Sequence, residues 1–174
     1  MVTYCRMCGH DTVYAGDCDL EAGDGLLDVA ADEGRTIVTR DVDLAARSER
    51  AILLESRDTD EQLRTLHDRG LDLTLPDEPR RCGRCNGPLE HVSEAETGTA
   101  DTPPYAPEPS EMAVWACRNC GQHFWKGSHW DSVRRRLGPV RSEKSSGERD
   151  SAGDENSPTE YQNDSAGNEY GSDQ

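Results

Sequence analysis

Residues 82–85 read CGRC and residues 117–120 read CRNC, and this repeated C-x2-C spacing decides how the second half of the chain folds. Each pair presents two thiolates on one tight turn, and two such turns face to face make the tetrahedral four-sulfur set that Zn²⁺ accepts. Gly87 and Gly121 follow within two positions and permit the backbone to bend. Because cysteine takes all four positions, no position is left for a substrate water, and we expect a structural zinc ion in a zinc ribbon. The expected ligands are Cys82, Cys85, Cys117 and Cys120.

Three further cysteines lie near the start of the chain and allow two interpretations. Cys5, Cys8, His10 and Cys18 are candidates for a second metal site, and Cys5 and Cys8 have the spacing of a redox pair. Alternatively, Cys5 and Cys8 pack as small apolar residues at a helix end, since free thiols are among the most buried groups. We favour the packing interpretation.

Upstream of the cysteine pairs, short apolar runs alternate with helical stretches. The pattern predicts strands at residues 11–15, 35–39 and 51–56, and helices at residues 23–34, 41–50 and 58–70. Strand and helix in this rhythm predict a parallel sheet with right-handed crossovers. The expected fold class is therefore α/β, a parallel sheet with flanking helices followed by the ribbon.

The chain begins in an unusual way for such a sheet. Residues 2–8, followed by Gly9, have the pattern of the last turns of a helix and its cap, and no strand precedes them. Because a parallel α/β sheet normally opens with a strand, we expect the first strand to be missing. Loss of a central strand exposes two edges and much of the core, so the chain as given is expected to be marginally stable.

Composition divides the chain into three expected parts. Pro76 and Pro79 break any helix leaving the first part, so we expect an α/β domain over residues 1–76 and the ribbon over residues 77–137. Between the cysteine pairs, the Pro- and acid-rich residues 93–112 are expected to form a mobile insert. Residues 138–174 bury too little surface to offset their ordering entropy and are expected to form a disordered acidic tail.

The formal net charge is −16, with 35 acidic residues and only two lysines, Lys126 and Lys144. A composition rich in Asp and Glu and poor in Lys is typical of archaeal proteins adapted to molar salt, where a hydrated carboxylate surface is screened. The ribbon lacks this bias: residues 79–137 carry 7 acidic and 8 basic groups, against 19 and 8 in residues 1–78. The ribbon is therefore the expected contact for a polyanion.

The sequence also indicates a compartment. No stretch approaches the length of a membrane span, and the first residues lack the charged start and apolar run of a secretory signal. An odd total of seven cysteines, arranged in C-x2-C pairs, indicates metal ligands in a reducing compartment more than disulfides. We expect a cytoplasmic protein with no membrane partner, and the sequence identifies no protein partner.

Asp41 and Asp43 follow the strand predicted at residues 35–39. In open α/β sheets ligands bind at the carboxyl ends of the strands, so both carboxylates are expected near a site. Acidic residues collected there are suited to Mg²⁺ or Mn²⁺, which prefer oxygen ligands and activate water for phosphodiester cleavage. The alternative, on spacing alone, is that an Asp after a strand caps the next helix.

Several stretches resemble the Mut-seven C-terminal RNase domain family: GHDTVYAGD (9–17), EGRTIVTRDVDL (33–44), RCGRCNGPLE (81–90) and CRNCGQHFWKGSHW (117–130). The resemblance covers nearly all of residues 2–137. It implies a PIN-like nuclease fold with a zinc ribbon at its C-terminal end, and a metal-dependent ribonuclease. The catalytic residues that it implies are Asp41, Asp43, Asp24 and Arg40, with Asp28 as an alternative to Asp24. Members of the family open with an Asp-bearing strand, which this chain lacks.

Basic and aromatic residues gather around the cysteine pairs. Cations for phosphates and rings for unstacked bases are the groups that hold single-stranded RNA. The alternative is that Trp115, Phe124 and Trp125 form the small core of the ribbon, which we expect for most of them. The expected RNA contacts are Arg84, Arg118, Lys126, His129 and Trp130.

Together these features predict a metal-dependent ribonuclease that uses Mg²⁺ or Mn²⁺ and holds RNA with its zinc ribbon. The alternative from another class is a non-catalytic RNA-binding or adaptor protein with a vestigial nuclease pocket. A ribbon that binds transcription or translation proteins is a third hypothesis, which leaves the α/β part unexplained.

Overall fold

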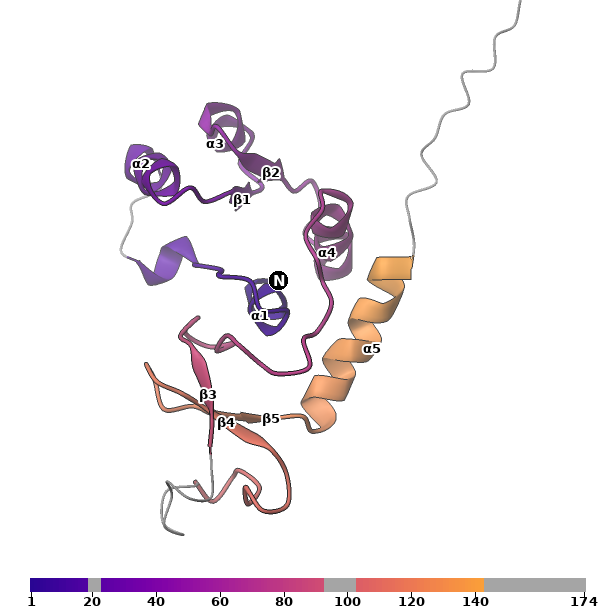
Figure 1. Ribbon diagram of the computed structural model, residues 1–174. Helices are drawn as coiled ribbons and strands as arrows, with labels where there is room; N and C mark the ends of the chain where they lie inside the picture. The colour runs from indigo at the N-terminus through magenta and orange to yellow at the C-terminus, as the bar shows by residue number, and fades with distance from the viewer. Residues whose placement is uncertain (19–22, 93–102, 143–174) are drawn as a thin grey trace, which may run out of the picture.

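A computed structural model describes residues 1–18, 23–92 and 103–142, and Figure 1 shows the arrangement of the helices and strands. The first part of the chain contains α1 (Val2–Met7), the 3-10 turn η1 (Ala15–Asp17), α2 (Asp24–Asp32), β1 (Ile37–Thr39), α3 (Val42–Arg47), β2 (Ala51–Leu53) and α4 (Thr59–Asp68). The second part contains β3 (Leu89–His91), β4 (Val114–Cys117), β5 (His123–Trp125) and α5 (Ser128–Ser142).

Strands β1 and β2 pair in parallel, with Val38 opposite Ile52, and α3 makes the crossover between them. Figure 1 places α2 and α3 beside this pair. The helices that follow the two strands each begin at an aspartate: Asp41 caps α3 and Asp58 caps α4, each accepting two backbone N–H groups. The α/β class and the parallel pairing are confirmed, although both strands are shorter than expected.

The strand expected at residues 11–15 is wrong. The backbone groups of Thr12, in the middle of this segment, are bound by two side chains instead of by a neighbouring strand. The Thr12 amide donates to Asn86 Oδ1 at 3.1 Å, and the Thr12 carbonyl accepts from Arg6 Nε at 2.8 Å. Since the backbone of Thr12 is satisfied in this way, the segment crosses the molecule as an extended loop that ends in η1.

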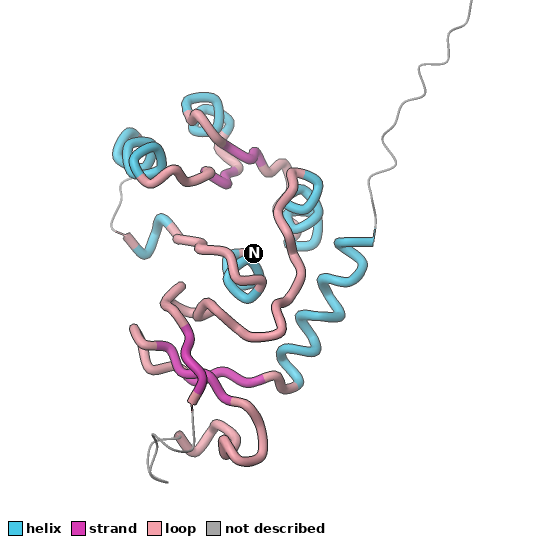
Figure 2. Tube along the Cα trace, viewed as in Figure 1, coloured by secondary structure: helices cyan, strands magenta, loops and turns pink. Residues whose placement is uncertain are grey.

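The ribbon is a three-stranded antiparallel sheet in the order β3-β4-β5, drawn as the three magenta strands in the lower part of Figure 2. Glu90 lies opposite Ala116, and Trp115 lies opposite Phe124. Trp115 is 6% exposed and forms the core of this small sheet, whereas Phe124 and Trp125 are half-buried. Of the three rings expected to form the core of the ribbon, Trp115 is therefore buried, and Phe124 and Trp125 are only partly covered.

Helix α5 leaves the ribbon and returns to the α/β part, where it lies against α4 (Figure 1). Its buried residues Val133, Leu137 and Val140 share one core with Leu63 and Leu73, and residues of α1 pack against this core. The boundary expected at residue 138 lies inside α5, which continues to Ser142 because Leu137 and Val140 are each 1% exposed. The rest of the expected acidic tail, residues 143–174, lies outside the described residues.

The insert between the cysteine pairs is described only from residue 103. There the Tyr105 ring packs near β5, with its centroid 6.4 Å from the centroid of the Trp125 ring and 6.5 Å from that of His123. Residues 93–102 of the expected mobile insert lie outside the described part of the chain. Among the described residues, no helix has the length and apolar character needed to cross a bilayer.

Candidate metal centre and nucleic-acid interface

The sulfur atoms of Cys82, Cys85, Cys117 and Cys120 all lie within 4.8 Å of one another. The Sγ atoms of Cys82 and Cys120 are 3.7 Å apart, and those of Cys85 and Cys117 are 3.5 Å apart. A tetrahedral site with Zn–S bonds of about 2.3 Å has sulfurs about 3.8 Å apart, whereas a disulfide needs about 2.05 Å. The four sulfurs therefore fit one zinc ion and are not disulfides.

The two turns that carry these cysteines have matching backbones. We call residues 82–87 the first knuckle and residues 117–122 the second knuckle. In each, the residue directly after the second cysteine has a left-handed backbone: Asn86 with φ of 65° and Gly121 with φ of 70°. Asn and Gly adopt this region most readily, so both turns close without a large steric cost.

Because Gly87 has no side chain, the two knuckles can lie close together beside the metal centre. Its φ is not left-handed, but a Cβ at this position would lie 2.9 Å from Cys117 Sγ and 2.9 Å from Cγ of Asn119. The two knuckles therefore approach more closely than any side chain larger than hydrogen permits.

Burial of the Cys82 side chain raises the pKa of its thiol to about 12. Hydrogen bonds from the backbone of Cys85 and Arg84 lower this pKa, but the effect of burial is larger. The metal-free site is thus neutral at Cys82 at ordinary pH. Because the thiolate is the ligand form, a metal ion has to displace this proton when it binds.

The first knuckle is bound to α1 by a buried arginine, Arg6, which is 4% exposed. Its Nη1 donates to the carbonyls of Gly83 at 3.3 Å and Arg84 at 2.7 Å, while its Nε donates to Thr12 O. One guanidinium therefore satisfies three carbonyls that come from two distant segments, and fixes α1 to the knuckle.

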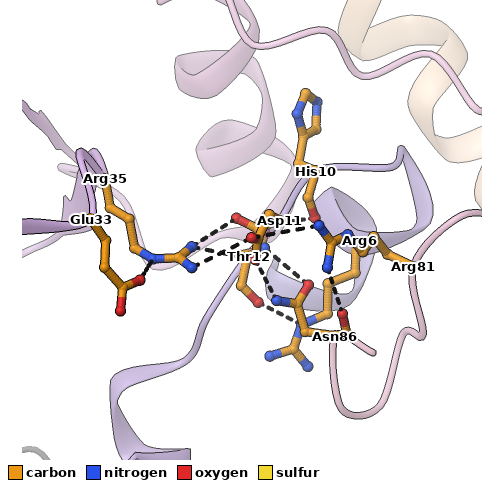
Figure 3. Close-up of polar contacts among 8 residues, drawn as sticks. All are labelled: Arg6, His10, Asp11, Thr12, Glu33, Arg35, Arg81 and Asn86. Atoms are coloured by element: carbon orange, nitrogen blue, oxygen red, sulfur yellow. Dashed lines mark hydrogen bonds and ion pairs between the residues drawn. The ribbon is translucent and has the colours of Figure 1, made fainter. Parts of the chain in front are cut away.

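A second link joins the same knuckle to the loop after α1 (Figure 3). Asn86 Nδ2 donates to Asp11 Oδ1 at 2.6 Å, and the guanidinium groups of Arg35 and Arg81 lie beside the same carboxylate. The hydrogen bond from Asn86, together with these arginines, holds the pKa of Asp11 below its usual range. The Asp11 carboxylate thus joins the α/β part, through Arg35, to the ribbon.

Of the other three cysteines, Cys5 and Cys8 behave as packing residues, whereas Cys18 is exposed. Cys5 is 4% exposed, and Cys8 packs against the core that α4 and α5 share. Burial raises the pKa of both thiols, to about 12 at Cys8. In the described part of the chain the four ribbon cysteines are the one group of three or more metal-capable side chains, so a second metal site at Cys5 and Cys8 is not formed.

The expected catalytic residues after β1 are exposed and lie at the carboxyl end of that strand. Asp41 Oδ1 accepts the backbone N–H groups of Asp43 at 2.9 Å and Leu44 at 3.0 Å, so Asp41 is the N-cap of α3. Both bonds go to one oxygen. Arg40 precedes the cap and is exposed, with no ion pair to any described residue.

Asp24 and Asp28 lie elsewhere, on α2, and line a pocket of about 510 Å³ between α2, the end of α3 and the loop before β2. Asp24 pairs with Arg47 of α3, and Glu49 joins the same lining. Asp41 and Asp43 do not line this pocket. The expected catalytic carboxylates therefore form two separate groups, and in neither do three metal-capable side chains come within ligand distance of one another.

Three of the expected RNA contacts line a second pocket, of about 320 Å³: Arg84, His129 and Trp130. Arg84 and His129 are exposed, whereas Trp130 is 5% exposed, so only a small part of its surface is open to the pocket. Lys126 adjoins them, with its Nζ 5.9 Å from the centroid of the Trp130 ring. Arg118 lies apart on the second knuckle and pairs with Glu90.

Sequence reasoning missed Arg6, Asn86 and Glu49. Asn86 carried a signal, because it occupies the position after its cysteine pair that Gly121 occupies in the second knuckle. Arg6 carried none, since a carbonyl that it binds lies 77 residues away.

A small parallel α/β unit joined to an antiparallel ribbon with four converging cysteines defines the class of the protein: an α/β domain with an appended metal ribbon. Residues 1–137 match the Mut7-C RNAse domain, and the chain belongs to that family. The family predicted from the sequence is thereby confirmed. No curated protein and no solved structure matches the chain.

Proposed function

We propose that this protein is a ribonuclease that hydrolyses phosphodiester bonds with Mg²⁺ or Mn²⁺, and that its zinc ribbon holds the RNA strand. The observation that carries the proposal is membership of the Mut7-C RNAse domain family over residues 1–137. The placement of Asp41 and Asp43 supports it, because parallel strands present ligand sites at their carboxyl ends.

In this proposal Asp41 and Asp43 hold the catalytic cation. The helix-capping bonds of Asp41 use Oδ1, which leaves Oδ2 for a metal ion. Arg40, exposed and without an ion pair to a described residue, is placed to attract a phosphate of the strand. When bound, Mg²⁺ or Mn²⁺ supplies an activated water and neutralises charge on the phosphate.

The test is Asp41→Asn in the full chain, assayed on single-stranded RNA with Mg²⁺ or Mn²⁺. Asparagine caps helices about as well as aspartate, so the variant removes the charge and keeps α3. We expect cleavage to fall on the order of 100-fold, as when a metal-binding carboxylate is lost.

Asp72→Asn is the matched control, because Asp72 Oδ1 also accepts a local backbone N–H, from Thr74, at an exposed position after α4 that lines neither pocket. It should cleave like the parent. Metal-dependent cleavage that is unchanged in Asp41→Asn would remove the active-site assignment.

A second function is favoured by one observation. The described carboxylates do not gather into a set of three metal ligands, which fits a protein that binds RNA without cutting it. In that case the ribbon is the working part. The two functions differ in one result: RNA that is bound but stays intact in Mg²⁺ and Mn²⁺ identifies the adaptor.

A further inference from the structure

The pocket of about 320 Å³ lies where α1, the first knuckle, β5 and α5 meet. Its lining combines three aromatic rings, from Phe124, Trp125 and Trp130, with the aliphatic side chains of Met7 and Leu89. The volume is near the lower end of the range of about 300–1,000 Å³ that small-molecule sites span. A flat, mostly apolar group of the size of one nucleobase matches such a space.

The charge of this pocket is opposite to that of the chain. The chain has 35 acidic residues, yet no acidic residue of the described part lines the pocket, while Arg81, Arg84 and His129 do. The first pocket, by contrast, is lined by Asp24, Asp28 and Glu49 as well as by arginines. A ligand with an apolar ring and a negative charge is therefore favoured at the second pocket.

Two groups at the pocket have unused binding capacity. Trp130 Nε1 is buried without a hydrogen-bond partner among the described residues, which costs free energy until an acceptor is supplied. Base carbonyl and ring nitrogen atoms are such acceptors. Arg84 is exposed and forms no ion pair with a described residue, so it is available to a phosphate.

The backbone at the pocket also favours an anion. His129 and Trp130 belong to the first turn of α5, a helix of 15 residues. The N-terminus of a helix carries partial positive charge and unpaired N–H groups, which bind phosphate. Arg81 is held by Asp11 and by the carbonyl of Asn86, so it shapes the wall of the pocket.

From these observations we infer that the pocket binds one unstacked nucleotide of an RNA strand. The base lies among the aromatic rings, and Arg84 with the start of α5 receives the adjoining phosphate. The inference rests on the proposed function, to which it adds the position where the ribbon grips the strand.

The test measures binding of fluorescein-labelled hexauridylate by anisotropy, with zinc-loaded full chain and no added Mg²⁺ or Mn²⁺, so that no cleavage intervenes. Arg84→Ala removes the free cation, and Thr3→Trp fills the pocket from an exposed position on α1 that lines it. Arg69→Ala is the matched control for charge, since Arg69 is exposed at the end of α4 and lines neither pocket.

We expect each pocket variant to weaken hexauridylate binding about tenfold, the loss of one charge-assisted contact or one buried ring contact. The control should bind like the parent. Uridine monophosphate should bind more weakly than the hexamer, because a strand makes further phosphate contacts. Zinc content and circular dichroism equal to those of the parent establish that each variant is folded.

Parental affinity in both folded pocket variants would overturn the inference, and so would monophosphate binding as tight as that of the hexamer. Failure of the nucleotide pocket and failure of the proposed nuclease activity give different results. Binding that needs the pocket, without any cleavage that depends on Asp41, refutes only the nuclease. Cleavage that depends on Asp41, with binding indifferent to the pocket, refutes only the present inference.

Discussion

Arg6 is a buried charged residue whose guanidinium is held by several hydrogen bonds. Its guanidinium donates to three carbonyls, of Thr12, Gly83 and Arg84, and among the described residues its one ion pair is with Asp17, at 3.8 Å. Removing one partner from a buried hydrogen-bonded set leaves the others unsatisfied, which costs more than the bonds themselves contribute.

Arg6→Met should therefore lower the free energy of unfolding by about 3 kcal/mol, although methionine fills much of the same volume. Arg6→Lys should recover part of the loss, because an ammonium group cannot reach all three carbonyls from one position. Urea unfolding followed by circular dichroism measures both values. Equal stability of Arg6→Met and the parent would show that α1 is not held in this way.

Gly87 tests the close approach of the two knuckles. Gly87→Ala places a Cβ 2.9 Å from Cys117 Sγ, and we expect zinc affinity to fall on the order of tenfold, as for other changes beside metal ligands. Competition with a chromogenic chelator measures the affinity.

The comparison variant is Gly138→Ala, whose added methyl group meets no atom within 4 Å and lies in the helix α5. It should bind zinc like the parent. A Gly87→Ala protein with undiminished zinc affinity would show that the knuckles separate at little cost.

At the scale of elements, α5 connects the two parts of the chain. Leu137 is 1% exposed and packs with Leu63 and Leu73, while Arg136 bonds Tyr4 of α1 and Asp60 of α4. Leu137→Ala should cost 2 to 5 kcal/mol, about the range for an aliphatic core side chain cut to alanine.

Urea unfolding with tryptophan fluorescence follows the ribbon and the start of α5, through Trp115, Trp125 and Trp130, and far-ultraviolet circular dichroism follows the helices. Both signals should shift to lower urea together in Leu137→Ala. Arg135→Ala, an exposed change on the same helix, should leave both in place. If only one signal moves, α5 does not couple the two parts.

Some elements were predictable because local pattern and tertiary packing agree. Helix α4 has its aspartate cap and its apolar spacing in the sequence, and Leu63 and Leu66 of that pattern are buried. The strand expected at residues 11–15 failed because the backbone of Thr12 bonds to Asn86 and Arg6. No local pattern records Asn86, a partner 74 residues away.

In helix α5 the local sequence preference and the tertiary packing disagree. Gly138 and Pro139 lower helix propensity within it, and Pro139 removes a backbone donor, yet the helix continues to Ser142. Burial of Leu137 and Val140 in the shared core outweighs the local preference. The cysteine site was predictable because spacing alone defines four ligands. The carboxylate site was less so, since Asp41 and Asp24 prove to lie in different groups.

At the scale of the whole molecule, the ribbon is attached to the α/β part at three places: Arg6, the Asp11–Asn86 link, and the core that α5 completes. Each attachment involves the first knuckle or a helix that follows the second. The position of the nucleotide pocket therefore depends on the four sulfurs holding the knuckles together. The arrangement of the ribbon thus rests on a zinc ion at those sulfurs.

X-ray absorption at the zinc edge, on the full chain purified without chelator, shows whether this zinc ion is present and which atoms bind it. We predict one zinc per chain with a first shell of four sulfurs at about 2.3 Å. A protein free of stoichiometric metal, or a zinc shell that contains nitrogen or oxygen in place of sulfur, would contradict the account.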